Sequence, residues 1–194
     1  MIELLETIKI IDGKPYFLEY HNNRLNDSRK TLFHCTEKID LATVIHPPIK
    51  RGCYRCRVIY AEALETIEYH PYFERTFKYF QVIEANALTY DFKYVNRESI
   101  NALGADKGLA DDILILKQGI VTDTSMANVA FWQGTQWITP AVPLLKGTTR
   151  QRLLDERKIV PQIIKIDDLI HFNKMAIMNA LIGFYVIKNF VLVD

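Results

Sequence analysis

Residues 113–131 read Ile113-Leu-Ile-Leu-Lys-Gln-Gly-Ile-Val-Thr-Asp123-Thr-Ser-Met-Ala-Asn128-Val-Ala-Phe131 and hold three short apolar runs in close succession. Such runs, rich in Ile, Val and Phe, are typical of buried strands. Strands are expected at 113–116, 120–122 and 128–131, with a turn at Gln118-Gly119. Asp123 lies in the polar loop before the third strand. A carboxylate there is either a turn former or an acceptor for a cationic ring nitrogen.

The chain beyond this stretch predicts one more strand, two helices and a strand-like end. Gly147-Thr148-Thr149 opens a helix that runs through Glu156, and its start is either an ordinary threonine cap or an anion cradle of backbone N–H groups. A short strand is expected at Trp137-Ile138, a second helix from near Asp167 toward Met178, and a strand-like segment at Phe184–Val193.

The chain before this stretch predicts a smaller α+β unit. Two β-rich runs flank Asp12-Gly13, which is a strong hairpin signal. An amphipathic helix is expected over 19–33, because apolar residues recur there between charged ones. Strands are expected at Cys53–Tyr60, near Glu65–His70 and at Tyr79–Glu84. The first 85 residues are therefore expected to form an α+β unit.

Composition restricts the function classes. The 194 residues carry 24 basic and 23 acidic side chains, a net charge of +1, which argues against a broad nucleic-acid or anionic-membrane surface. No apolar run approaches a membrane helix, and the start lacks the features of a signal peptide. The lone Cys53-Tyr-Arg-Cys56 pair and the scattered histidines form no metal pattern. A soluble cytoplasmic protein without a metal site is expected.

Two cations are further candidates for chemistry. Lys93 lies among aromatic residues in Asp91-Phe-Lys-Tyr-Val-Asn-Arg97. Its stem either packs while the amine reaches water, or the amine is desolvated and suited to Schiff-base chemistry. Arg24 lies on the expected first helix, where it is either a solvated arginine or a fork donor for a phosphate.

Taken in order, these segments resemble the class IV aminotransferase family over nearly the whole chain. Glu6-Thr-Ile, Asp12-Gly13 and Arg24-Leu25 are similar to the family's opening strand, hairpin and helix. Val121-Thr-Asp123…Asn128-Val-Ala-Phe131, Lys146-Gly147-Thr-Thr149-Arg150 and Asn179-Ala180-Leu181 are similar to three of its later motifs. Lys93-Tyr-Val-Asn96-Arg97 and Asn179-Ala180-Leu181 are closer to the family's 4-amino-4-deoxychorismate lyase branch. The family pattern begins earlier, so a shortened start is expected.

The resemblance implies a two-domain α+β fold. It has a small α+β domain over 1–85, a linker over 86–98 that carries Lys93, and a larger domain over 99–194 with a mixed, partly barrel-like sheet. It implies pyridoxal 5′-phosphate between the domains, with Lys93 as the Schiff-base lysine and catalytic base. The cofactor-binding residues that it implies are Arg24, Lys93, Asp123, Asn128, Gly147, Thr148, Thr149, Asn179 and Ala180. It also implies a homodimer acting on a small amino substrate.

The resemblance leaves three functions open. Elimination of pyruvate from aminodeoxychorismate, giving 4-aminobenzoate for folate synthesis, is preferred because of the lyase-like motifs. A transaminase for a D- or branched-chain amino acid is the alternative, although Glu98 stands where branched-chain enzymes place a tyrosine. Asp123, one methylene shorter than the family's glutamate, and the shortened start motivate the third, a remnant with weak catalysis.

Overall fold

A computed structural model describes residues 2–48, 50–105 and 107–193. The chain forms two compact units, each described here by itself. The first comprises the chain up to Glu74 together with Phe92–Asn96, and the second comprises Arg75–Asp91 and the chain from Arg97 onward. The strand predicted at Tyr79–Glu84 forms as expected but belongs to the second unit, because its backbone partners lie there.

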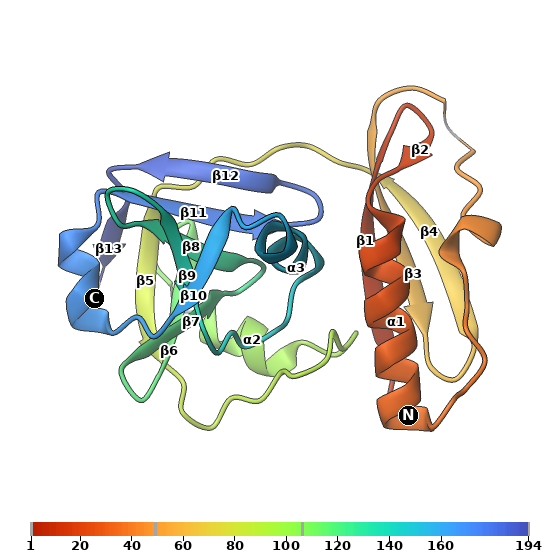
Figure 1. The fold of residues 1–194 in the computed structure, drawn as a ribbon, viewed down its shortest axis with the longest axis horizontal. Helices are drawn as coiled ribbons and strands as arrows, with labels where there is room; N and C mark the ends of the chain where they lie inside the picture. The colour runs from red at the N-terminus through yellow and green to blue at the C-terminus, as the bar shows by residue number, and fades with distance from the viewer. Residues whose placement is uncertain (1, 49, 106, 194) are drawn as a thin grey trace. The chain divides into compact units, whose positions relative to one another are not determined.

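The first unit is a four-stranded sheet with one long helix. The sheet order is β2-β1-β3-β4, and neighbouring strands are antiparallel. Its elements are β1 (Leu4–Ile11), β2 (Lys14–Pro15), α1 (Leu18–Phe33), η1 (Leu41–Thr43), β3 (Cys53–Tyr60) and β4 (Leu64–Pro71). In Figure 1, α1 runs along one face of this sheet. The predicted hairpin and helix are both confirmed.

The core of the first unit lies between α1 and the sheet. Even-numbered residues of β1 face the helix, because side chains alternate along a strand. Leu4, Ile8 and Ile10 are buried there with Leu25 of α1 and Val58 of β3. Burial of these side chains holds the helix on the sheet.

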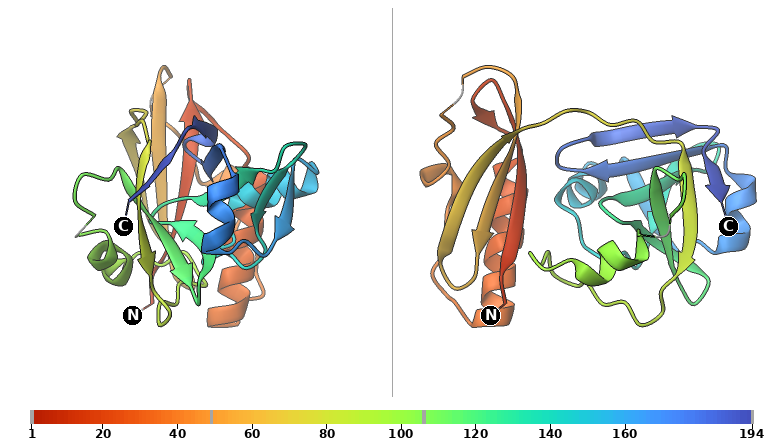
Figure 2. Two further views of the ribbon diagram at one scale, coloured as in Figure 1. Left: turned by 90° about the vertical axis from the view of Figure 1, so that its left-hand side faces the viewer. Right: turned by 180° about the vertical axis from the view of Figure 1, so that it is seen from behind.

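The second unit is built on a nine-stranded mixed sheet. The main path is β10-β9-β8-β7-β6-β5-β13, and β11 pairs with β8 and β12. The strands are β5 (Tyr79–Glu84), β6 (Asp112–Lys117), β7 (Ile120–Thr124), β8 (Asn128–Trp132), β9 (Trp137–Pro140), β10 (Ile159–Gln162), β11 (Lys174–Asn179), β12 (Gly183–Lys188) and β13 (Val191–Val193). The helices are α2 (Glu98–Leu103), α3 (Thr148–Asp155) and η2 (Ile166–His171). Figure 1 and the right-hand view of Figure 2 show β11 and β12 side by side. The predicted α+β class with a mixed sheet is confirmed.

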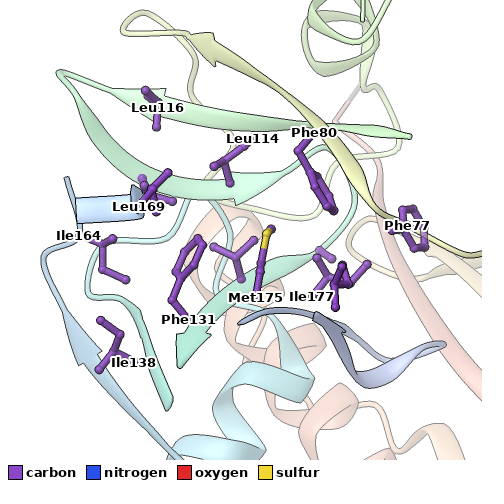
Figure 3. Packing of buried hydrophobic residues seen from close by; sticks show 14 residues of the cluster. Phe77, Phe80, Leu114, Leu116, Phe131, Ile138, Ile164, Leu169, Met175 and Ile177 are labelled. Carbon is purple, nitrogen blue, oxygen red and sulfur yellow. The ribbon is translucent and has the colours of Figure 1, made fainter. Parts of the chain in front are cut away.

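The core of the second unit is formed by side chains from several strands. Figure 3 shows Phe80 of β5, Leu114 of β6, Phe131 of β8 and Met175 of β11 converging. Each of these four is fully or almost fully buried. The three apolar runs of residues 113–131 therefore form β6, β7 and β8, and each of these strands contributes side chains to this core.

The helix predicted from near Asp167 toward Met178 is wrong in its second half. Residues 166–171 form the short helix η2, but Lys174–Asn179 is the strand β11. β11 has backbone partners on both edges, and Met175 through Met178 are all buried. Such a continuous apolar run has no period that separates a buried strand from a buried helix.

Two further expectations concern membranes and metals. Among the described residues, no helix is both long enough and apolar enough to cross a membrane. Nor do those residues gather three or more potential metal-binding side chains of the His, Cys, Asp or Glu type. Cys35, Cys53 and Cys56 are free thiols.

Candidate functional site

A fully buried carboxylate organises the first unit's functional residues. Glu6 accepts three hydrogen bonds at its two oxygens. Arg24 donates from Nε at 2.8 Å and from Nη2 at 2.7 Å, and His21 Nδ1 lies 2.6 Å from Oε2. The exposed fraction is 0% for the Glu6 side chain, 1% for His21 and 16% for Arg24. The guanidinium of Arg24 is therefore held in a fixed orientation by a bidentate contact.

The local structure explains why these three side chains meet. Glu6 occupies an inward position of β1, between Leu4 and Ile8. His21 and Arg24 are three residues apart on α1, so they lie on the same helix face, above the strand. The sequence predictions missed Glu6 and His21. A charged residue in the apolar register of a strand was the available signal.

The charges of this cluster are settled by burial and mutual contact. Burial alone would raise the pKa of Glu6, but the charge of Arg24 and the hydrogen bonds from His21 and Arg24 outweigh it and hold the pKa at about 2. Burial lowers the pKa of His21, and the charges of Arg24 and Lys93 act in the same direction. At neutral pH the cluster holds an ionised Glu6, a charged Arg24 and a neutral His21.

Lys93 is held beside the same strand. Its carbonyl accepts a hydrogen bond from the Leu5 N–H at 2.8 Å, and the Val95 N–H donates to the carbonyl of Glu3 at 3.0 Å. Lys93 is also one of the charges that lower the pKa of His21, so its amine is near the Glu6 cluster. The structure thus brings two predicted site residues, Lys93 and Arg24, to one region of the first unit.

The second unit places Asp123 at the end of β7 in a buried position. Only 4% of the residue is exposed. Its Oδ1 accepts from Asn128 Nδ2 at 2.7 Å and its Oδ2 from the Leu145 N–H at 2.9 Å. Burial raises the pKa of Asp123 to about 7, although these hydrogen bonds and the nearby Arg150 oppose the rise. A carboxylate in this state would gain from a cation placed next to it.

This pKa predicts a pH dependence of the ligand-free protein. Because the folded-state pKa of Asp123 lies above its unfolded value of 3.8, the folded state binds more protons between about pH 4 and pH 7. The contribution of Asp123 to stability is therefore largest below that range and falls as the pH rises through it. Urea unfolding across this range should show that Asp123→Asn removes part of the slope. An unchanged slope would contradict the raised pKa.

The beginning of α3 is connected to Asp123 through Leu145, which donates to the carboxylate two residues before Gly147. Gly147 precedes α3, and no side chain of the described residues caps the helix. Thr148, Thr149 and Arg150 in its first turn are each buried. Arg150 donates from Nη2 to the Pro140 carbonyl at 2.8 Å, while its buried Nε finds no acceptor among the described residues. The first turn thus combines helix-end N–H groups, two hydroxyls and a buried cation, which favour an anion.

Asn179 is placed at the turn between β11 and β12. Its Oδ1 accepts from the N–H groups of Leu181 at 2.9 Å and Ile182 at 3.0 Å, and its Nδ2 donates to the Met126 carbonyl at 3.2 Å. Ala180 lies in the same turn. Met126 belongs to the turn between β7 and β8, so Asn179 links the two turns.

Arg97 and Glu98 begin the second unit's helix α2. The Arg97 guanidinium donates to the Ser125 carbonyl, in the turn that follows Asp123. Glu98 is exposed on the first turn of α2. This contact joins the start of α2 to the turn between β7 and β8 within the second unit.

The predicted site residues therefore fall into two groups. Lys93 and Arg24 lie together in the first unit, around Glu6. Asp123, Asn128 and the start of α3 lie together in the second unit, and Asn179 is joined to them through Met126. The cofactor contacts assigned to these residues remain predictions.

Comparison with known proteins gives consistent matches over nearly the whole chain. The model of the amino-transferase class IV family matches residues 3–190. An uncharacterized protein of Haemophilus influenzae is 35% identical over 191 residues, 94% of this chain and 100% of that protein. A crystal structure from Haemophilus somnus, named "putative 4-amino-4-deoxychorismate lyase", is 33% identical, covers 94% of this chain and 98% of its own, and has a TM-score of 0.87. A "hypothetical aminotransferase" of Mycobacterium tuberculosis in a form bound to pyridoxal phosphate (PLP) has the same fold, with a TM-score of 0.76, 16% identity, and coverage of 98% and 81%.

Proposed function

Because the chain belongs to the amino-transferase class IV family, whose cofactor is pyridoxal 5′-phosphate, we propose that it is a 4-amino-4-deoxychorismate lyase. In this proposal it releases pyruvate from aminodeoxychorismate and leaves 4-aminobenzoate. The observation that carries it is the segment from Lys93 to Glu98. This segment has the Lys-x-x-Asn-Arg pattern of the lyase branch, and an exposed glutamate follows where branched-chain transaminases have a tyrosine.

The residues present fit the cofactor. A phosphate dianion needs fixed cations and N–H donors. Arg24 in the first unit is a fixed cation, and the first turn of α3 in the second unit offers N–H donors. The buried Nε of Arg150 adds a cation near Asp123 that the protein leaves partly unsatisfied. A protonated ring nitrogen needs a carboxylate beside it. Asp123 is a buried carboxylate, and a neighbouring cation would offset the cost of burying its charge. The shorter side chain of Asp123 is held in place by Asn128 and Leu145.

Each residue has a separate task in the proposed reaction. Bound pyridoxal phosphate supplies the electron sink for a negative charge developing at the Cα of an amino substrate. Lys93 binds the cofactor and then acts as the base that accepts the Cα proton. Arg24, oriented by Glu6, neutralises the phosphate. Asp123 keeps the ring nitrogen protonated, which favours the electron sink.

The proposal predicts products that distinguish it from transamination. The purified protein with pyridoxal phosphate and aminodeoxychorismate should form 4-aminobenzoate and pyruvate in equal amounts. Chromatography and a coupled pyruvate assay would measure both. Steady keto-acid formation from an amino donor, without an aromatic product, would instead establish the transaminase.

A further inference from the structure

Asn128 has an amide group that is fully engaged inside the second unit. Its Nδ2 donates to Asp123 Oδ1 at 2.7 Å and to the Leu145 carbonyl at 2.7 Å. An amide nitrogen carries two hydrogens, so both are used by protein acceptors. The residue is 5% exposed. Its amide hydrogens are therefore committed to the protein rather than to a ligand.

These contacts close a ring between two segments. The Leu145 N–H donates to Asp123 Oδ2 at 2.9 Å, while the Leu145 carbonyl accepts from Asn128. Asp123 and Asn128 are also directly paired between β7 and β8. The carboxylate is thus tied to the loop that leads into α3 directly at Oδ2 and through Asn128 at Oδ1. Movement of that loop would remove a donor from the carboxylate.

Gly147 completes the arrangement from the other side. A Cβ at this position would lie 2.1 Å from Asn128 Oδ1, well inside contact distance. Its φ of −71° is open to any residue, so the glycine is needed for space and not for backbone conformation. The amide oxygen of Asn128 therefore rests against the residue that opens α3.

We propose that Asn128 is a positioning residue that locks the Asp123 carboxylate to the loop before α3, so that both move as one element. This proposal rests on the proposed function only in naming pyridoxal phosphate as the group that the element binds. Asn128 then sets the spacing between the carboxylate for the ring nitrogen and the N–H groups for the phosphate. Its effect on the cofactor is exerted through Asp123 and Gly147.

The contact itself is tested in the ligand-free protein. Gly147→Ala should lower the melting temperature strongly, whereas the same change in an Asn128→Ala background should lower it little, because the clashing oxygen is gone. Gly104→Ala is the matched control, since its Cβ would be in ordinary contact with two backbone carbonyls, Asn101 at 3.7 Å and Ile100 at 3.8 Å. Additive losses from Gly147→Ala and Asn128→Ala would overturn the contact.

The coupling is tested by comparing three cofactor forms. Wild-type affinity for pyridoxal phosphate, divided by that for pyridoxal, reports on the phosphate loop. The affinity for pyridoxal phosphate, divided by that for the analogue with carbon in place of the ring nitrogen, reports on Asp123. Asn128→Ala and Gly147→Ala should each reduce both ratios, by about tenfold, as expected for loss of a charge-assisted contact. A loss of general stability would weaken all three forms equally.

Each outcome decides the proposal. Both ratios falling together supports the lock, and either ratio unchanged in Asn128→Ala overturns it. If the wild type binds no pyridoxal phosphate, the proposed function fails but the lock is still measurable. In that case Gly147→Ala should raise the pKa of Asp123 in a carboxyl-carbon NMR titration of the ligand-free protein. A titration identical to that of Gly104→Ala would overturn the lock.

Discussion

Lys93→Ala is expected to lower the rate of 4-aminobenzoate formation by about 10²- to 10⁴-fold, the range for loss of a positioned acid–base group. The proposed reaction needs this amine twice, to bind the cofactor and to accept the Cα proton. The segment around Lys93 is anchored on β1 through backbone hydrogen bonds to Glu3 and Leu5. Truncation of the side chain leaves these bonds in place, so the fold should survive.

The measurement combines turnover with cofactor attachment. Borohydride should fix the cofactor permanently on the wild type at Lys93, as peptide mass would show, and should fix none on Lys93→Ala. Lys9→Ala is the control. Lys9 lies on β1, the strand that anchors the Lys93 segment, but its side chain is on the opposite face from Glu6. Full activity in Lys93→Ala would remove this lysine from the reaction.

Local signals were sufficient for most of the secondary structure. Asp12 and Gly13 both adopt positive φ, at 49° and 77°, and join β1 to β2 as the hairpin signal predicts. Gln118 and Gly119 do the same between β6 and β7, at 53° and 72°. These turns are encoded by a few adjacent residues, which is why they can be predicted without knowing the tertiary structure.

Tertiary context decided the elements that could not be predicted. β11 is a strand because β8 and β12 pair with its two edges, and both partners are distant in sequence. β5 joins the second unit because it pairs with β6 and β13. No pattern within residues 79–84 or 174–179 states which strand lies beside them.

The candidate site shows the same division. Lys93, Arg24 and Asp123 stand within recognisable motifs, so they could be named as candidates from the sequence. Glu6 and His21 could not, because their importance comes from a buried contact between residues 15 apart. Their positions were nevertheless encoded, with Glu6 in the inward register of β1 and His21 one helical turn before Arg24.

Glu6→Gln is expected to destabilise the protein by about 2 kcal/mol. Removing one partner of a buried ion pair typically costs about 3–5 kcal/mol, and Arg24 retains some solvent, which lowers the cost. Glutamine keeps the shape of Glu6 but turns an N–H group toward the guanidinium or His21. The affinity for pyridoxal phosphate should also fall, because Arg24 loses its fixed orientation.

Urea unfolding of both proteins at a series of pH values measures this effect and its sign. Because the folded-state pKa of Glu6 is about 2, below its unfolded value of 4.5, its stabilisation is present above pH 4.5 and is lost as the pH falls toward 2. The difference between wild type and Glu6→Gln should therefore be constant near neutral pH and shrink in acid. Glu68→Gln, which breaks partly exposed contacts with Arg57 and His70, should change stability little at any pH. If Glu6→Gln behaved like this control, the buried carboxylate would not be what holds α1 and Arg24 in place.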